Sequence, residues 1–232
     1  MNDVSKEYSI LNSDVNKPTL LDHDEVTKNR TVYRFVKRTM DIVLSLIALV
    51  VLSPVFLITA ICIKLDSPGP VFFNQLRVGI NGKPILVFKF RSMCKDADRK
   101  LKEMEEFKKL GALDIKQRLT KDPRITKIGR IIRATSIDEL PQLANVLVGN
   151  MSLVGPRPLP IYEHDAMNEY QQKRTLVKPG LTCFWQVSGR STLNEEARVA
   201  LDYKYIQEQG VLTDIGLILK TMPAVISRRG AF

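Results

Sequence analysis

Cysteine is scarce in this chain, and its scarcity excludes two common kinds of scaffold. The three cysteines, Cys62, Cys94 and Cys183, are odd in number and far apart in the sequence. An odd and scattered set matches neither a disulfide framework nor the ligand spacing of a zinc site. The pattern is instead typical of a protein whose thiols stay reduced, such as one that faces the cytosol.

Acidic residues are also in short supply relative to basic ones. The 232-residue sequence has 35 Lys and Arg against 25 Asp and Glu, which gives a formal net charge of +10. An excess of this size indicates anionic partners: phosphates, nucleotides, lipid headgroups or nucleic acid. The length suits one domain together with the membrane element described next.

Charge is absent altogether from Ile42 to Ile63, the longest apolar run. As one straight helix this run would rise ~33 Å, about the thickness of a bilayer's hydrocarbon core, which weakens the case for nucleic acid. A proline inside a helix removes a hydrogen bond and clashes with the preceding turn, so Ser53 and Pro54 at the midpoint predict a sharp bend. A signal peptide does not fit, because the run begins late and no small-residue cleavage site follows it.

Basic residues flank both ends of the run, with Arg30, Arg34, Lys37 and Arg38 before it and Lys64 after it. Since basic flanks tend to stay on the cytoplasmic side of a membrane, both ends compete for that side. We expect a re-entrant helix-break-helix, which satisfies both ends; a kinked single-pass anchor is the alternative. Lys37 and Arg38 form either a collar of snorkelling side chains or a contact with a lipid phosphate.

Two short strands are predicted after the run, at VFFNQLRVG and ILVFKFRSM, on either side of a hairpin turn at Ile80–Pro84 that contains Asn-Gly. Side chains alternate between the faces of a strand, so Lys89 and Arg91 should share one face of the second strand. This pair is either a solvated basic face or a phosphate-binding pair. Helices are predicted at residues 96–110, 194–209 and 214–227.

The segment that begins at Ser136 carries a notable pair of acids. Ser136 and Glu139 match a capping box, and Pro141 is tolerated only in a first helical turn, so a helix is predicted to begin here. Asp138 and Glu139 then have two interpretations. They either cap the helix and complement its dipole, or they form a reactive pair in which one carboxylate attacks a substrate and the other holds a cation.

Arginines precede and follow this pair along the chain. Arg133 comes before it, and Arg157 lies between two prolines that stiffen the backbone, which suits a guanidinium presented at a fixed place. A surface turn with an incidental arginine is the alternative. Further on, Trp185 and Arg190 lie in a glycine-bounded segment that is typical of a binding loop. Stacking of Trp185 on a base and ordinary packing are both open.

Taken in order, five motifs resemble those of the monotopic phosphoglycosyl transferases, the bacterial sugar transferases that begin polysaccharide and glycoconjugate assembly. They are KRTMD followed by an apolar run with a central Ser-Pro, then KFRSM, SIDELPQLANVL, GNMSLVGPRP and KPGLTCFWQVSGR. The resemblance covers roughly residues 34–232. It implies transfer of a sugar 1-phosphate from a UDP-sugar to a polyprenyl phosphate, typically undecaprenyl phosphate, with release of UMP.

The resemblance also implies roles for particular residues and a cofactor. Asp138 is implied as the nucleophile, and Glu139 helps to hold Mg²⁺, with Asp138 as a further metal ligand. The cations implied in binding the diphosphate and the lipid phosphate are Lys89, Arg91, Arg133, Arg157 and Arg190.

The fold implied is α/β and mostly helical. It comprises a flexible tail at 1–30, a re-entrant membrane hairpin at 31–65 with its break at Ser53 and Pro54, and a catalytic domain at 66–232. Amphipathic helices and a small β-hairpin form this compact domain, which faces the cytoplasm at the bacterial inner membrane. The residues assigned to the lipid-phosphate interface are Lys37, Arg38 and Asp41.

Other functions compete with this one. A membrane-associated scaffold without enzymatic activity would bind anionic lipid and an assembly complex, and a phosphatase acting on lipid diphosphates would release inorganic phosphate. Nucleic acid is not an expected partner, and pairing into a homodimer through the C-terminal amphipathic helix is left open. The sugar is expected to be glucose or galactose, with an N-acetylated sugar as the alternative.

Overall fold

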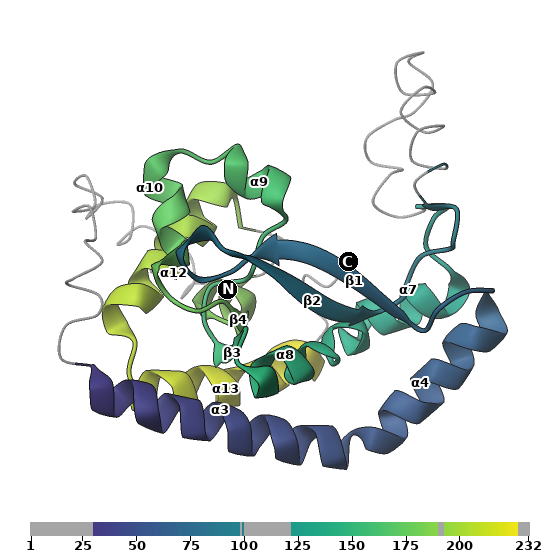
Figure 1. Ribbon diagram of the computed structural model, residues 1–232, viewed down its shortest axis with the longest axis horizontal. Coiled ribbons are helices and arrows are strands. Elements are labelled where there is room, and N and C mark those ends of the chain that lie inside the picture. Colours follow the sequence, from purple (N-terminus) through teal and green to yellow (C-terminus); the bar gives the residue numbers. More distant parts are fainter. Residues whose placement is uncertain (1–29, 98, 100–121, 190–192, 227–232) are drawn as a thin grey trace.

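The computed structural model describes residues 30–97, 99, 122–189 and 193–226. These residues form a mostly helical α/β fold with two small sheets, in agreement with the expected class (Figure 1). The N-terminal tail expected from the sequence, except for Arg30, and most of the helix predicted at 96–110 lie outside the described residues.

A bent pair of helices forms the lower side of the molecule in Figure 1. Helices α3 (Thr31–Val51) and α4 (Ser53–Asp66) meet at 58°, with the break at Leu52. Pro54 lies in the first turn of α4, where its missing N–H costs no helical hydrogen bond, so the bend predicted at Ser53 and Pro54 is confirmed. Within the described residues no single helix is long and apolar enough to cross a membrane, but this pair meets both criteria together.

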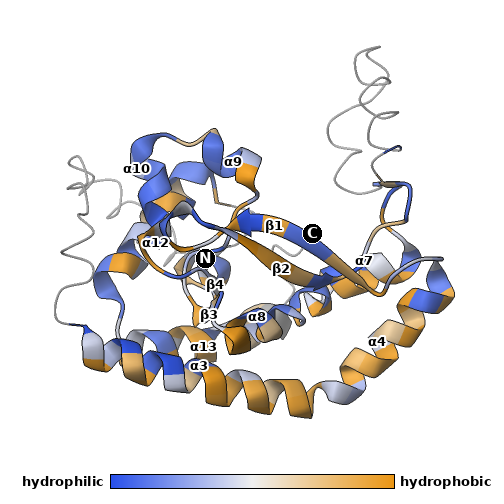
Figure 2. Cartoon of the chain, viewed as in Figure 1, coloured by the Kyte–Doolittle hydropathy of each residue, from blue (hydrophilic) through white to orange (hydrophobic). Residues whose placement is uncertain are grey.

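Apolar side chains cover much of this pair, which we call the arm (α3 and α4), and they appear as orange segments along both helices in Figure 2. Those with half or more of their surface exposed include Leu46, Ile47, Val50, Val51, Leu57, Ile58 and Ile61. A continuous exposed apolar surface of this kind marks a contact with lipid or with another protein.

The domain above the arm is built from short elements. In chain order they are β1 (Phe72–Val78), η1 (Ile80–Gly82), β2 (Pro84–Phe90), α7 (Lys127–Ala134), η2 (Ile137–Glu139), α8 (Gln142–Val148), β3 (Ser152–Val154), α9 (Ile161–Asp165), α10 (Glu169–Gln172), η3 (Lys173–Leu176), β4 (Gly180–Thr182), α11 (Phe184–Ser188), α12 (Glu195–Glu208) and α13 (Val211–Ile226). The last two helices confirm the predictions at 194–209 and 214–227.

The hairpin of β1 and β2 matches its prediction in both position and turn. The two strands pair antiparallel along their whole length, and η1 closes the turn with Asn81 at φ 54° and Gly82 at φ 74°. These positive values are the left-handed conformation that Asn and Gly adopt with least strain. The Asn-Gly pair is therefore the local cause of the turn.

The second sheet, a parallel pair of β3 and β4, is not signalled in the sequence. It brings two glycines together just beyond β3: a Cβ added to Gly180 would lie 2.1 Å from the backbone nitrogen of Gly155. Only a residue without a side chain permits this approach. The pairing fixes the chain that follows Gly155, which carries Arg157.

A buried carboxylate on α3 fixes the arm to the domain. Asp41 is only 3% exposed, and its Oδ1 accepts hydrogen bonds from the Leu153 backbone N–H at 2.9 Å and from the Ser152 hydroxyl at 3.1 Å. Both donors belong to β3. They compensate part of the hydration that the carboxylate loses on burial, so the arm and the second sheet form one unit.

Lys37 and Arg38, on the same helix, are also engaged within the protein. Arg38 donates to the backbone carbonyls of Val146 and Leu147 in α8, at 2.7 Å each. Lys37 Nζ lies 2.7 Å from Asp214 Oδ2 in α13. The sequence left a lipid phosphate open as the partner of these cations; within the described residues both have protein partners.

Trp185 lies in helix α11 and not in a binding loop. Its ring is partly buried and packs against the core cluster that includes Val154 and Tyr205, while the guanidinium carbon of Arg198 lies 5.4 Å from the ring centroid. Of the two interpretations left open, the structure supports ordinary packing. Arg190, the phosphate partner considered with it, lies outside the described residues.

Asn145 joins α8 to the hairpin, and we predict a large stability cost for its replacement. The fully buried amide accepts from the Phe88 N–H at 3.0 Å and donates to the Leu86 carbonyl at 2.6 Å. Asn145→Leu leaves both backbone groups of β2 without a partner, so the free energy of unfolding should fall by about 2–4 kcal/mol in denaturant titrations in detergent. The exposed Asn74→Leu on β1 should change it by less than about 0.5 kcal/mol; an equal loss in both variants would contradict the prediction.

Candidate active site

The two acids lie in η2, a tight turn between α7 and α8. Its hydrogen bonds run from the Glu139 N–H to the Ser136 carbonyl at 3.2 Å and from the Leu140 N–H to the Ile137 carbonyl at 3.1 Å, the spacing of a 3₁₀ turn. The predicted capping box is wrong, because Ser136 has φ 57° and its side chain makes no capping hydrogen bond. Helix α8 begins only after Pro141, which has no N–H and would clash with the carbonyl four residues before it.

Glu139 is held by two cations from distant parts of the chain. Lys89, near the end of β2, places its Nζ 3.0 Å from Glu139 Oε1. Arg157, in the segment after β3, donates from Nη1 to Glu139 Oε2 at 2.9 Å and from Nη2 to Oε1. The arginine thus binds the carboxylate with two donors, which is the strongest arrangement available to this pair.

These contacts fix the charge of Glu139. Burial alone would raise its pKa, but the positive charges of Arg157 and Lys89 outweigh burial and hold the pKa well below its usual range. The negative charge of Glu139 in turn raises the pKa of Arg157. Burial lowers the pKa of Lys89, an effect that Glu139 opposes. Glu139 is therefore ionised at every pH at which the protein would work.

Asp138, the next residue, has a different environment. Burial, followed by the charge of Glu139, raises the pKa of Asp138 to about 6, although Lys89, Arg133 and Arg157 act in the opposite direction. Within the described part of the chain its carboxylate has no hydrogen-bond or ion-pair partner. It is ionised above pH 6, and no described Lys or Arg side chain forms an ion pair with it. A carboxylate in this state is suited to act as a nucleophile or as a metal ligand.

Arg77, on β1, belongs to the same cluster and was missed from the sequence. It donates to the Pro158 carbonyl at 2.6 Å and to Gln75 Oε1 at 2.9 Å, and burial, followed by the charge of Arg157, lowers its pKa. The alternation of side chains along the predicted hairpin could have indicated this. The strand register places Gln75 and Arg77 on the same face of the hairpin as Lys89.

The remaining predicted cations differ in whether they lie near the two acids. Arg91 is 7% exposed and donates to the carbonyls of Ser67 and Pro68, so it stabilises the turn that follows α4. Arg133, in the last turn of α7, acts on Asp138 through its charge and has no ion pair within the described ranges. The structure therefore gathers the two acids with Lys89, Arg133 and Arg157. It places Arg91 apart from them, and Lys37, Arg38 and Asp41 between the arm and the domain.

The two acids differ in how well they would serve as ligands of a Mg²⁺ ion. No group of three or more His, Cys, Asp or Glu side chains within the described residues is arranged to hold a metal. Mg²⁺ needs few protein ligands when phosphates and waters complete its octahedron. The unpaired oxygens of Asp138 fit that role. Glu139 fits it less well, because Lys89 and Arg157 occupy Oε1 and Arg157 also binds Oε2, which leaves one lone pair of Oε2 for a metal.

Carboxylates in two different states beside several cations suit phosphoryl transfer, since cations bind phosphate oxygens and a carboxylate without an ion pair can attack. The chain belongs to the bacterial sugar transferase family, whose model matches residues 32–228. The family and the activities named for its relatives identify the protein as a phosphoglycosyl transferase.

Curated relatives differ in how much of their length this chain matches. The exopolysaccharide production protein ExoY of Sinorhizobium fredii is 38% identical over 200 residues, which cover 84% of this chain and 88% of that protein. The UDP-glucose:undecaprenyl-phosphate glucose-1-phosphate transferase of Escherichia coli is 43% identical, over 82% of this chain and 40% of that protein. The undecaprenyl-phosphate galactose phosphotransferase of Salmonella typhimurium is 40% identical, over 86% and 42% respectively.

Replacing Asp138 should stabilise the protein. A carboxyl whose pKa is raised in the folded state destabilises that state once it ionises, so Asp138→Asn should raise the free energy of unfolding by about 1–3 kcal/mol at pH 8 without magnesium. The gain should be complete above pH 6 and should vanish as the pH falls to about 4, the pKa of an unfolded aspartate. Urea titrations at several pH values measure it; a loss of stability at pH 8 would contradict the assigned environment.

Replacing Glu139 should change the free energy of unfolding in the opposite direction. Its lowered pKa means that the ionised form stabilises the fold above the unfolded pKa of about 4.3. Glu139→Gln removes this charge from between Lys89 and Arg157, so the free energy of unfolding should fall by about 1.5–3 kcal/mol at pH 8. The deficit should shrink as the pH is lowered below about 4. If both amide variants shift stability in the same direction, the assigned division between the two acids is wrong.

Proposed function

We propose that this protein transfers a sugar 1-phosphate from a UDP-sugar to undecaprenyl phosphate, releasing UMP, as the first membrane step of polysaccharide assembly. The names of the Escherichia coli and Salmonella relatives support the carrier and the type of reaction. The observation that carries the proposal is the unpaired Asp138 carboxylate among fixed cations. It supplies a nucleophile where a diphosphate would be bound.

The first step is attack by an Asp138 carboxylate oxygen on the phosphorus that bears the sugar. As this bond forms, the bond from the same phosphorus to the bridging oxygen breaks, and UMP leaves with the electron pair. The product is an acyl phosphate that links Asp138 to the sugar phosphate. The reaction needs Asp138 to be ionised, which holds above pH 6.

The second step returns the enzyme to its starting state. A phosphate oxygen of undecaprenyl phosphate attacks the same phosphorus, and the bond to Asp138 breaks, which restores the carboxylate. The product is a polyprenyl diphosphate that carries the sugar. Splitting the transfer into two displacements lets a water-soluble donor and a lipid acceptor use one site in turn.

The cations of the site stabilise the charge that builds up on the phosphoryl oxygens during both steps. Arg157 and Lys89 are already fixed by Glu139, so they need no rearrangement as the charge develops. Arg133, which has no ion pair within the described residues, is available to the diphosphate or the lipid phosphate. A magnesium ion held by Asp138, with Glu139 Oε2 as a further ligand, would supply further neutralisation when bound with the donor diphosphate.

The bent arm supports a re-entrant membrane hairpin on the cytoplasmic face of the inner membrane. Its first helix contacts β3, α8 and α13, and its second helix packs through Phe56 and Ile63 against Phe90 and Ile132 of the same domain. A single-pass anchor would carry the two ends of the arm to opposite sides of the bilayer. Contacts from both ends to one domain favour a hairpin that enters and leaves by the same leaflet.

The sugar is proposed to be glucose or galactose, with an N-acetylated sugar as the second choice. The names of relatives include a glucose-1-phosphate transferase, a galactose phosphotransferase and an N-acetylgalactosaminephosphotransferase from Aeromonas hydrophila. Identities to all three lie between 36% and 43%, which is too narrow a range to separate the sugars.

Purified protein with magnesium should release many UMP per enzyme from one of a panel of UDP-sugars only when undecaprenyl phosphate is present, because without the acceptor the reaction stops after one UMP. Asp138→Asn should lower the rate of UMP release by at least about 10³-fold, as expected for loss of a nucleophile. Asp165→Asn, an isosteric change at an exposed acid of α9, is the matched control and should retain the rate. Retained turnover in Asp138→Asn would refute the assigned nucleophile.

A single-turnover experiment separates the competing functions. With donor labelled in the sugar phosphate and no acceptor, the label should become attached to the protein through Asp138. Lipid binding that is indifferent to both acids, without UMP release, would indicate a scaffold. Release of inorganic phosphate from a lipid diphosphate would indicate a phosphatase.

A further inference from the structure

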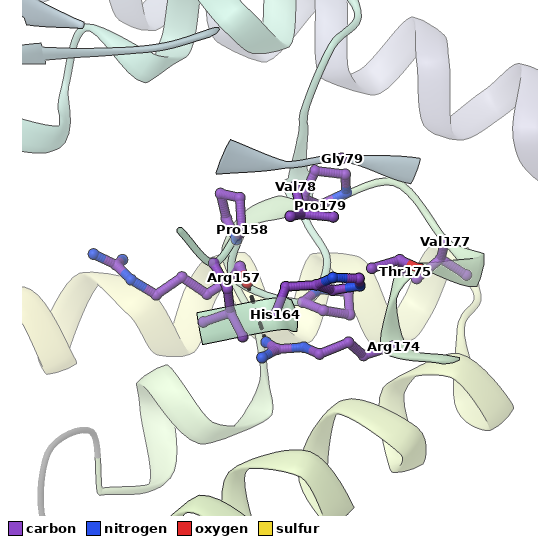
Figure 3. A pocket seen from close by; sticks show the side chains of 11 residues that line it. Val78, Gly79, Arg157, Pro158, His164, Arg174, Thr175, Val177 and Pro179 are labelled. Atoms are coloured by element: carbon purple, nitrogen blue, oxygen red, sulfur yellow. Dashed lines mark hydrogen bonds between the residues drawn. The ribbon is translucent and has the colours of Figure 1, made fainter. Parts of the chain in front are cut away.

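Residues 156–159, which we call the Arg157 segment, are held in place in part by two other arginines. Arg77, from β1, donates to the Pro158 carbonyl at 2.6 Å, and Arg174, from η3, donates to the Arg157 carbonyl at 3.1 Å. Figure 3 shows Arg174 reaching back to this carbonyl while the Arg157 side chain points away from the pocket. Two consecutive carbonyls are thus held by side chains from different elements.

Arg174 is itself fixed in the core. Its side chain is 6% exposed and lies 2.6 Å from Asp202 Oδ2, in α12, whose side chain is fully buried. A buried ion pair gains little net stability over well-packed apolar side chains, because both charges lose their hydration. The nitrogen closest to Asp202, Nη2, is also the one that donates to the Arg157 carbonyl. The charge of Asp202 therefore holds this nitrogen beside the Arg157 backbone.

Arg77 is also committed to neutral acceptors. Its Nε and Nη2 lie 3.2 and 2.9 Å from Gln75 Oε1, and its Nη1 binds the Pro158 carbonyl. Within the described residues neither Arg77 nor Arg174 forms an ion pair with Asp138 or Glu139. Their hydrogen bonds therefore act on the acidic pair through the backbone that carries Arg157.

We propose that Arg77 and Arg174 are positioning residues that hold the Arg157 guanidinium on Glu139 and so set where the donor diphosphate is bound. This rests on the proposed function, in which Arg157 meets the diphosphate. The prolines on either side of Arg157 have no N–H, so the segment has few donors of its own with which to fix its conformation. The two arginines supply part of that constraint from outside, together with the backbone N–H groups of Val78 and Gly180.

Charge-conserving variants test the proposal, because lysine keeps the charge but lacks the fork of donors. Arg77→Lys and Arg174→Lys should each lower kcat for UMP release by about 10- to 100-fold, the cost of a small misplacement, with a smaller change in KM for undecaprenyl phosphate. In an Arg157→Lys background the same changes should cost less than about twofold, since the group that they position is gone. Fully additive losses would overturn the proposal.

Arg198→Lys is the matched control. Arg198 lies on α12, as Asp202 does, and its guanidinium lies over the Trp185 ring. The variant should keep the kcat of the unmodified protein. If Arg174→Lys fails to fold because its buried ion pair is disturbed, Arg77→Lys decides the question, since Arg77 has no buried ion pair among the described residues.

Amide hydrogen exchange tests the same positioning without turnover. The N–H groups of Val78 and Gly180 are both bonded to carbonyls of the Arg157 segment, at 2.9 Å each. In Arg77→Lys and Arg174→Lys their exchange should accelerate by at least about 10-fold, while the Phe88 N–H, bonded to α8, should be unchanged. Unchanged exchange at both amides would overturn the proposal. Accelerated exchange in a protein that releases no UMP would preserve the positioning role and reject the proposed function.

Discussion

The paired charges around Glu139 are the interaction on which the site depends. Lys89 and Arg157 come from distant segments and approach the same carboxylate, which offsets both their mutual repulsion and their loss of hydration. Because Glu139 takes both cations, Asp138 beside it has no ion pair with any residue that the structure describes. The two neighbouring acids therefore have different environments: one joins distant segments, and the other forms no such link.

A second constraint is the attachment of the arm to the domain. Asp41, Arg38 and Lys37 turn one side of α3 into a polar surface that binds β3, α8 and α13. The opposite side is apolar and exposed. The arm is therefore attached to the domain, and the fold sets the distance between its exposed apolar side and the Asp138 carboxylate.

The basic excess of the sequence has two uses in the structure. Some cations, such as Lys89 and Arg133, face the acidic pair. Others hold backbone carbonyls: Arg38 at α8, Arg91 at the turn after α4, and Arg77 and Arg174 at the Arg157 segment. A fold made of short elements leaves many carbonyls outside regular pairing, and buried carbonyls need donors. The net charge of +10 therefore includes cations that stabilise the backbone as well as cations beside the acidic pair.

The sequence by itself determined the features that depend on neighbouring residues. The bend at Ser53 and Pro54 follows from a missing N–H, the hairpin turn follows from the conformational freedom of Asn81 and Gly82, and the acids of η2 are adjacent in the chain. Only the tertiary structure decided which partner each cation takes. Arg91, identical in type to Arg157, binds a turn instead of an acid, and Arg77 joins the site because the hairpin register places it on the same face as Lys89. A long cationic side chain can meet any acceptor within its reach, and the packing of distant segments determines which acceptors are there.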